Sequence, residues 1–334
     1  MPKSAKSSRP FLVRWGSPQQ RVYLLLGGAL VAVGLFHLGP VLLVGLAFYT
    51  VLDQIQRLLS KFLGRGMARY ASLAIFLVVF IIVVFILAKF VRQSISAVPA
   101  ILAKLIPALN QFSDRFGFDF QFDNVGELQA ALMATFRENL GTITRSGQGL
   151  TKEAFKIFLG GMAAVFYFMG GSQALGGSSL YTVLAVEMER QVHRFLTSFG
   201  LVVGAQVVIS GINTSVTFIF LTAVGMPYVL FLVLTTFLSG LLPIIGNLIS
   251  STIIVGTALT VSPHLALLSL VYLVVIHKAE YFMNSRIVGS KVEMPMWQIL
   301  VAIVLGEATL GLAGIPLAPA ILHFARREML EMKT

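Results

Sequence analysis

The sequence predicts an all-α polytopic membrane protein with about seven to eight transmembrane segments, two of them broken by glycine and proline. Of its 334 residues, 57% are hydrophobic and only 12% are charged, about half the charge of an average soluble domain. Three stretches contain no Asp, Glu, Lys or Arg: residues 22–52, 157–186 and 195–277. Because a helix crosses a bilayer core with about 20 apolar residues, these stretches have room for several spans.

The net charge of +11 is concentrated at the ends of the predicted spans. The basic residues precede the first span, fill one short loop and close the chain: Lys3, Lys6, Arg9, Arg14, Arg21, Arg57, Lys61, Arg65, Arg69, Arg326, Arg327 and Lys333. Such clustering in short loops is the positive-inside signal. We therefore expect the lipid bilayer as a partner and not nucleic acid, a location in the cell inner (plasma) membrane, and both termini in the cytoplasm.

The sequence indicates no cofactor or metal chemistry. It has no cysteine, and its five histidines are scattered without the spacing of metal ligands. It contains no Walker loop, dinucleotide-binding glycine pattern or nucleophile elbow. We therefore expect no cofactor, no metal and no enzymatic activity, and an ATP-driven pump would need a partner to supply the motor.

The N-terminal part is expected to hold three spans. A disordered cytoplasmic tail (1–20) is followed by two spans at about 21–36 and 39–56, which a tight Gly-Pro turn joins. A basic loop (57–70) and a third span at about 71–90 follow, so that spans 1 to 3 lie within 21–91. The first apolar run has no small-residue cleavage site after it, so it is predicted to be a retained span and not a signal peptide.

Residues 92–152 differ in kind, because their charges are mixed and nearly balanced. Apolar residues at helical spacing predict an amphipathic helix at 94–112. By the parity of the spans, 92–152 is an extracytoplasmic amphipathic subdomain resting on the bilayer. It serves either as a structural cap or oligomer contact, or as a gate for substrate.

The following region, 153–196, is predicted to contain span 4 at about 153–170 and an amphipathic helix at 178–196. The second helix carries its charges on one side, which is typical of a helix lying in the cytoplasmic interface. Span 5 follows at about 197–223. It opens a transport core, 197–325, which is followed by a cytoplasmic tail, 326–334.

Two segments of this core do not have the pattern of plain spans. Residues 228–260 are interrupted by Gly240 to Asn247, and residues 298–323 by three glycines and two prolines. Span 7, about 263–284, lies between them. Opened backbone is tolerated at membrane depth only inside protein or beside a polar cavity, and paired interruptions indicate the central site of a transporter. The two segments are either helical hairpins or kinked full spans.

Charged and amide residues in the core are the candidate site. Glu280 lies near the end of span 7, and Glu307 is the one charged residue between Met294 and Ala325. A carboxylate at membrane depth is costly, so each is expected to face a cavity or a partner and to mark an ion or proton path. An interfacial ion pair is the alternative for Glu280, and a helix-break cap is the alternative for Glu307. Amides at Gln206, Asn213, Asn247 and Gln298 join helices or line the path.

A set of motifs in the C-terminal half resembles a known family. They are Gly225-Met226-Pro227, the run Leu242-Pro243-Ile244-Ile245-Gly246-Asn247, the run from Glu280 to Gly289, Pro295, and Gly311-Leu312-Ala313-Gly314 with Pro319. With the layout of early spans, long amphipathic insert and broken C-terminal half, they resemble the autoinducer-2 exporter family of permeases over nearly the whole chain. Three positions depart from the family pattern: Ser285 replaces a usual proline, Gly204-Ala205-Gln206 keeps only the glutamine of a basic-Gly-Gln signature, and Glu307 replaces a small residue.

The resemblance implies export of a small polar solute or signal molecule such as autoinducer-2. It implies that this export is coupled to an ion, because sodium or proton antiport is described for other branches of the family. It also implies a homo-oligomer. Two alternatives stay open: a sodium (lithium)/proton antiporter, and a non-transporting membrane scaffold. If the protein is an exporter or an antiporter, the broken segments and span 7 form the moving site, and Glu280, Glu307 or both couple protonation to movement. The predicted substrate and ion pathway consists of Gln206, Pro243, Gly246, Asn247, Glu280, Asn284, Arg286, Glu307, Gly311 and Gly314.

Overall fold

The computed structural model describes residues 17–116, 130, 134, 147–170, 179–242, 245–287 and 294–331, which form helices and turns with no strand. The described helices are α1 (Pro18–Leu35), α2 (Gly39–Leu59), α3 (Arg65–Phe116), α5 (Gly147–Gly170), α6 (Leu180–Ala223), α7 (Val229–Gly240), α8 (Ile245–Leu259), α9 (Pro263–Ile287), α11 (Met296–Leu310), the 3-10 turn η2 (Gly311–Ala313) and α12 (Gly314–Glu331). Six helical stretches of the described part are long and apolar enough to cross a membrane, one of them the run Trp297–Glu331 that contains α11, η2 and α12, and α7 and α8 are shorter apolar helices. The predicted all-α membrane fold is confirmed.

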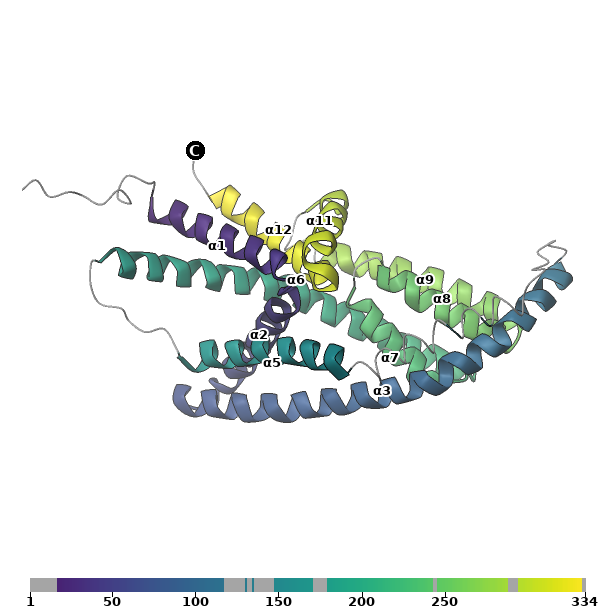
Figure 1. The fold of residues 1–334 in the computed structure, drawn as a ribbon. Coiled ribbons are helices and arrows are strands. Elements are labelled where there is room, and N and C mark those ends of the chain that lie inside the picture. Colours follow the sequence, from purple (N-terminus) through teal and green to yellow (C-terminus); the bar gives the residue numbers. More distant parts are fainter. Residues whose placement is uncertain are drawn as a thin grey trace, which may run out of the picture.

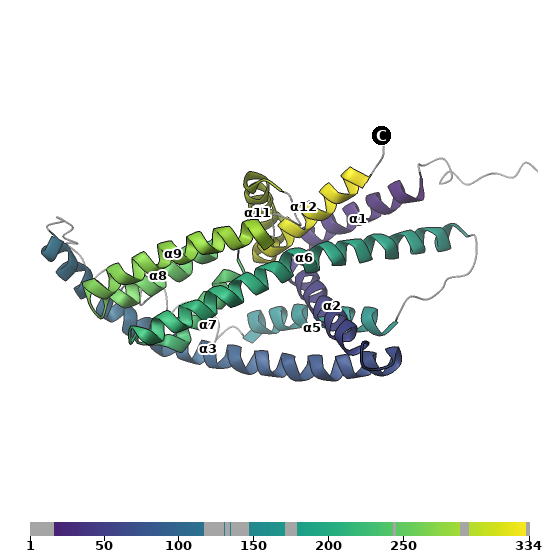
Figure 2. The ribbon, with the colours of Figure 1, turned by 180° about the vertical axis from the view of Figure 1, so that it is seen from behind.

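The molecule is built around α6, which runs along most of its length (Figures 1 and 2). Helices α7, α8 and α9 lie beside its C-terminal half, and α1 and α12 lie beside its N-terminal half. The sequence predicts an interfacial helix and then a separate span here, but the structure has one helix of 44 residues. No proline interrupts residues 180–223, so the helix continues to the turn at Gly225, which has a left-handed backbone (φ 65°).

Helix α3 also joins two predicted elements. The span expected at 71–90 and the amphipathic helix expected at 94–112 are one helix of 52 residues, with Pro99 and Pro107 inside it. Residues 91–93 are Val-Arg-Gln, so neither glycine nor proline separates the two predicted elements. The helical prediction for 94–112 is confirmed, and the predicted separation is wrong. Most of the remaining predicted subdomain, 117–146, lies outside the described residues.

Both broken segments are helical hairpins. Helices α7 and α8 have 12 and 15 residues, about 18 and 22 Å, and each is shorter than a bilayer core of about 30 Å. They pack against each other so closely that a Cβ on Gly246 would overlap the carbonyl group of Ser239. Helices α11 and α12 meet in the same way, because a Cβ on Gly314 would overlap the carbonyl group of Gly306. Gly311, at φ 65°, ends α11 with a conformation that favours glycine.

A third helix break packs on the second hairpin. The turn between α1 and α2 has His37 in the left-handed region (φ 51°). On either side of this turn, a Cβ on Gly34 would lie 3.3 Å from the carbonyl oxygen of Thr309, and Gly39 lies against the carbonyl of Leu310. The α1–α2 turn and the α11–α12 break therefore meet in the middle of the molecule (Figure 1).

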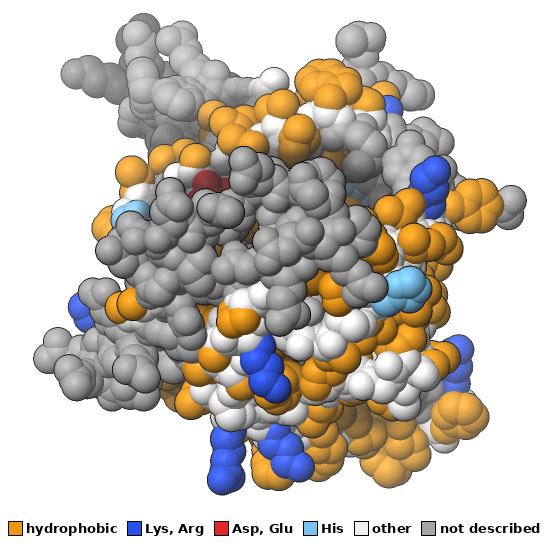
Figure 3. Space-filling view, turned by 90° about the vertical axis from the view of Figure 1, so that its right-hand side faces the viewer, with side chains coloured by type: hydrophobic (Ala, Val, Ile, Leu, Met, Phe, Trp, Pro, Cys, Tyr) orange, Lys and Arg blue, Asp and Glu red, His pale blue; other side chains and the backbone are white. Residues whose placement is uncertain are grey.

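The outer surface is that of a protein in lipid. Helix α3 exposes large apolar side chains on nearly every side over residues 77–87. Figure 3, which faces the end of the molecule where α3 ends, shows hydrophobic side chains spread over much of the described surface. Since exposed apolar surface of this extent is unfavourable in water, the fold fits a hydrocarbon environment.

Candidate functional site

The site is organised by a polar stripe on α6. Gln206, Ser210, Asn213 and Thr217 are spaced by four, three and four residues, so they share one face of the helix. Each makes a hydrogen bond to a neighbouring helix of the core, two to α7 and two to α9. This stripe lies in the longest charge-free stretch of the chain.

The first two members of the stripe hold the tip of the α7–α8 hairpin. The amide Nε2 of Gln206 donates to the carbonyl oxygen of Gly240 at 2.6 Å, and the hydroxyl of Ser210 donates to the carbonyl oxygen of Phe237 at 2.8 Å. Carbonyl groups in the last turn of a helix have no partner within it. Side chains of α6 therefore satisfy the C-terminal end of α7 inside the protein.

The centre of the site is a buried carboxylate, Glu280 of α9, which is 7% exposed. The Nδ2 of Asn213 on α6 donates to one carboxylate oxygen at 3.0 Å. The Nδ2 of Asn247, at the start of α8, lies 2.9 and 3.0 Å from the two oxygens. We call these three residues the Glu280 centre. Within the described part of the chain no Lys or Arg forms an ion pair with Glu280.

The hydrogen bonds of the Glu280 centre depend on the charge of the carboxylate. A hydrogen bond to a charged group contributes about 1.5–3 kcal/mol, roughly twice a neutral one. Protonation of Glu280 would therefore weaken the attachment of α9 to both α6 and α8.

The amide oxygen of Asn213 is buried and has no hydrogen-bond partner among the described residues. A half-turn of this amide would aim the oxygen where the nitrogen now points.

Further polar groups continue from the Glu280 centre along α9. The hydroxyl groups of Thr217 and Tyr272 are 2.9 Å apart, and the Tyr272 ring stacks on Phe220 with centroids 3.9 Å apart. On the α8 side, Nε2 of His277 lies 3.4 Å from the hydroxyl of Ser251. Sequence reasoning missed Ser210, Thr217 and Tyr272 as site residues. The four-three-four spacing of polar residues in a charge-free stretch was the available signal.

The predicted site residues are divided between the two hairpins. Four of them meet at the tip of α7–α8. Gly246 and Asn247 belong to the tip, Gln206 of α6 bonds to Gly240 there and Glu280 of α9 bonds to Asn247. The side chain of Glu307 on α11 is exposed and makes no hydrogen bond or ion pair with any described residue, while its carbonyl oxygen accepts from the N–H of Gly311 at the end of α11. Gly311 and Gly314 form the α11–α12 break. Pro243 lies outside the described residues, and Asn284 and Arg286 lie on α9 with side chains outside the description.

A second buried carboxylate ties the chain ends to α6. Glu328 of α12 is 3% exposed, accepts from Arg194 of α6 at 2.7 Å and accepts from the hydroxyl of Tyr23 on α1. Arg194 also pairs with Glu331 at 2.7 Å. Because Glu328 has a cation as its partner, it differs from Glu280, which is held by neutral amides.

The fold and the site together indicate the class of protein. Two helical hairpins, α7–α8 and α11–α12, pack on a long central helix of a polytopic membrane protein, and a buried carboxylate of α9 contacts the tip of the first hairpin. This is the arrangement in which secondary transporters build their sites from broken helices. Among the described residues there is no cluster of three or more His, Cys, Asp or Glu that could hold a metal ion.

Comparison with known proteins gives the family. The family model described as "AI-2E family transporter" matches residues 22–333, so the chain belongs to this family. The chain is similar to the Bacillus subtilis (strain 168) protein named "Putative transport protein YdbI", at 29% identity over 133 residues, which is 39% of this chain and 38% of that protein. The matched part thus spans well under half of that relative's length.

Proposed function

We propose that the protein is an ion-coupled secondary transporter that exports a small polar solute or signal molecule such as autoinducer-2, with Glu280 as the coupling group. The observation that carries the proposal is a buried carboxylate that, among the described residues, is held by the amides of Asn213 and Asn247 and by no cation. Such a group is costly at membrane depth and is a functional site by default.

The coupling follows from the hydrogen bonds. Ionised Glu280 holds α8 and α9 against the stripe of α6 through its two asparagines. On protonation these bonds weaken, and the α7–α8 hairpin is freed to move relative to α6. The tip of the hairpin also bonds to Gln206 and Ser210. Movement of the hairpin would break these two bonds and open a path beside the stripe. Proton binding and solute release are then linked through one element.

A second candidate, sodium (lithium)/proton antiport, is favoured by one specific observation. The buried amide oxygen of Asn213 has no partner in the described part of the chain, and carboxylate and amide oxygens are the ligands that hard cations prefer. With both asparagines rotated, the Glu280 centre would offer oxygens from three helices. Cation and proton would then compete for one carboxylate.

The test is transport by the full chain in liposomes that enclose a pH-sensitive dye. Sodium gradients and autoinducer-2 gradients are imposed separately, with empty liposomes as the control. Proton flux that follows autoinducer-2 and disappears in Glu280→Gln supports the exporter. Proton flux that follows sodium alone supports the antiporter. If no gradient moves protons and labelled solute does not cross, both candidates fail and the non-transporting scaffold remains.

A further inference from the structure

The turn that joins α2 to the start of α3 is both basic and apolar. We call residues 60–70 the α2–α3 turn; they contain three basic residues and no acidic one. Backbone hydrogen bonds define its path, because the N–H groups of Phe62 and Leu63 donate to the carbonyl oxygen of Leu59 at 3.0 and 2.8 Å. The side chains of the turn therefore project from a defined backbone.

The turn is fixed to the neighbouring helices. Leu52 of α2, Phe76 of α3 and Phe168 of α5 form a buried apolar cluster. The Nη1 of Arg69 donates to the carbonyl oxygen of Met169 at 3.2 Å, and a carbonyl group in the last turn of a helix has no partner within that helix. One of the three basic residues of the turn is thus used within the protein, where it caps α5.

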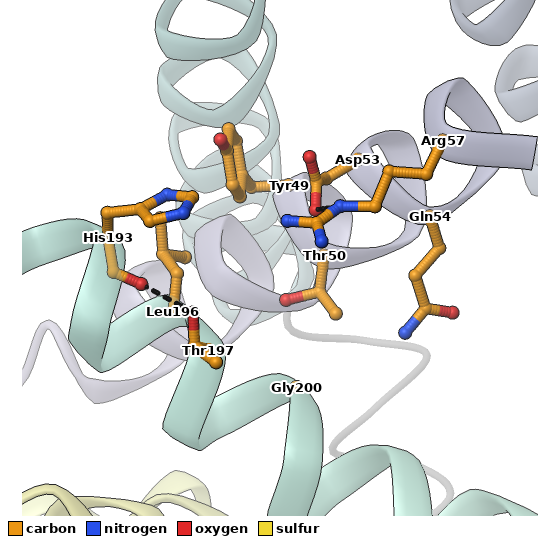
Figure 4. A pocket seen from close by; sticks show the side chains of 9 residues that line it. All are labelled: Tyr49, Thr50, Asp53, Gln54, Arg57, His193, Leu196, Thr197 and Gly200. Carbon is orange, nitrogen blue, oxygen red and sulfur yellow. Dashed lines mark hydrogen bonds and ion pairs between the residues drawn. The ribbon is translucent and has the colours of Figure 1, made fainter. Parts of the chain in front are cut away.

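The other two basic residues, Lys61 and Arg65, lack a counter-charge in the described part of the chain. Both are exposed, and neither forms an ion pair with any described residue. The nearest acidic residue in the sequence, Asp53, already pairs with Arg57 of its own helix at 2.8 Å (Figure 4). The turn therefore carries two positive charges that no described group neutralises.

Three arginines where α6 meets α12 are, in contrast, neutralised within the protein. Their ion pairs, with N···O distances from 2.6 to 3.1 Å, are Arg190–Glu187, Arg194–Glu328 and Arg327–Glu331. Both regions flank predicted spans, so the positive-inside signal includes both. Of the two, the α2–α3 turn is the one whose charge is left for a partner.

The turn also exposes large apolar side chains. Phe62 is 87% exposed, more than any other large apolar side chain of the described residues, and Met67 and Tyr70 are 68% and 67% exposed. Arg65 begins α3 about 9 Å before the predicted span at 71–90, so these side chains lie near the boundary of the hydrocarbon. Basic loops and aromatic side chains are typical of that boundary, and the positive-inside rule places this one at the cytoplasmic leaflet.

The two features select one kind of partner. Two cations without a counter-charge favour a group with net negative charge, and a zwitterionic headgroup brings its own cation. A free phosphate would neutralise the cations but leave Phe62 in water. An anionic phospholipid supplies both the charge and the acyl chains. We infer that the α2–α3 turn binds anionic phospholipid of the cytoplasmic leaflet, with Lys61 and Arg65 at the headgroup phosphate and Phe62 among the acyl chains.

The test places a fluorescent reporter in the turn of the full chain. Trp15→Phe and Trp297→Phe remove both native tryptophans, and Phe62→Trp adds one. The protein is reconstituted in phosphatidylcholine vesicles that contain a minor share of brominated phosphatidylglycerol or of brominated phosphatidylcholine. Bromine on an acyl chain quenches tryptophan on contact, so quenching reports which lipid lies beside the turn. Phosphatidylglycerol should be enriched about fivefold or more, since one basic residue at an anionic surface contributes about 1 kcal/mol.

Two double variants of the reporter protein test the role of the charges. Lys61→Gln with Arg65→Gln should bring the enrichment close to one. Lys89→Gln with Arg92→Gln is the matched control, because it removes two exposed cations of the same helix, the first about 36 Å along α3 from Arg65. The control should keep the preference for phosphatidylglycerol.

Melting of the wild-type chain in detergent separates lipid from other partners. Added phosphatidylglycerol should raise the melting temperature, whereas glycerol phosphate, which has the charge without the chains, should not. The inference is overturned if the two brominated lipids quench equally, if Lys61→Gln with Arg65→Gln keeps the preference, or if glycerol phosphate stabilises as strongly as the lipid. Quenching by neither lipid would also overturn it and would indicate that protein covers the turn. None of these outcomes depends on solute flux, so the inference and the proposed function can fail separately.

Discussion

The two hairpins have the same outline and are held in place by different interactions. Hairpin α7–α8 is attached to α6 and α9 by side-chain hydrogen bonds, including those of the buried Glu280. At its tip, hairpin α11–α12 is attached to the α1–α2 turn by backbone contact through Gly34 and Gly39. The far end of α12 is attached to α6 by the ion pairs of Glu328 and Glu331 with Arg194. The carboxylate of the first hairpin's site is buried, and Glu307 of the second is exposed.

The difference lies at the tips of the two hairpins. Hydrogen bonds to a carboxylate change with its protonation, so the attachment of the α7–α8 tip has two states that a proton can select. Close packing of glycine backbones at the α11–α12 tip has no such dependence and fixes one geometry, and the buried Glu328 of α12 is neutralised by Arg194. We therefore propose that coupling occurs at α7–α8, and that α11–α12 with α1 and α2 forms the frame.

The largest effect is expected at the backbone contact of the second hairpin. Gly314→Ala would place a methyl group on the carbonyl of Gly306, and overpacking of this kind costs about 1–3 kcal/mol or more. Unfolding titrations in detergent should show a loss at the upper end of that range. Gly28→Ala is the control, because no atom lies within 4 Å of the added Cβ, and it should be neutral or stabilising. Equal stability of the two variants would contradict the close backbone contact.

The next effect concerns the polar attachment of the first hairpin. Asn213→Ala removes one amide donor from buried Glu280 and should destabilise the protein by about 1.5–3 kcal/mol at neutral pH. The loss should shrink when Asn213→Ala is made in a Glu280→Gln background, because an uncharged side chain needs its donors less. The measurement is the same unfolding titration on the two single variants and the double variant. Equal losses in the two backgrounds would mean that Asn213 does not stabilise the charge of Glu280.

A shift of the pH profile should follow when the amide of Asn247 becomes a carboxylate. Asn247→Asp would put two carboxylates about 3 Å apart, in place of the present 2.9 Å hydrogen bond, and such a pair retains a shared proton to higher pH. The pH at half-maximal transport should therefore rise by about one unit or more. Liposome flux measured from pH 5 to 9 gives this value, with Ser251→Ala as a nearby control. An unchanged profile would remove Glu280 from the coupling step.

The smallest effect is expected at the far end of the stripe. Thr217→Val removes the hydroxyl that pairs with Tyr272 at 2.9 Å, and a neutral hydrogen bond contributes about 0.5–1.5 kcal/mol. Stability should fall within that range, while flux and its pH profile stay near those of wild type. A large change in the pH profile would extend the coupling site beyond the Glu280 centre.

The features that could be predicted from the sequence are those that depend on local composition. The charge-free stretches predicted the membrane helices, and Gly240 to Asn247 with Gly311 and Gly314 predicted the two breaks. The helix ends predicted between 90 and 94 and between 196 and 197 do not exist. Charged residues such as Arg92 and Arg194 suggested an interface there, but no glycine or proline interrupts the backbone at either place. The meeting of Asn213, Asn247 and Glu280 joins residues up to 67 positions apart, and only tertiary packing sets such a contact. Glu280 follows His277 and Lys278, whereas Glu307 lies in an apolar run, so the burial of the first and the exposure of the second could not be predicted from their surroundings.

The most direct test of the account compares Glu280→Gln with Glu307→Gln in the same liposome assay of proton-coupled solute flux. Both substitutions remove one charge and keep the size of the side chain. We expect Glu280→Gln to reduce coupled flux to the level of empty liposomes and Glu307→Gln to retain at least about half of the wild-type rate, because of the two only Glu280 is buried. Equal loss in both variants, or normal coupled flux in Glu280→Gln, would contradict it.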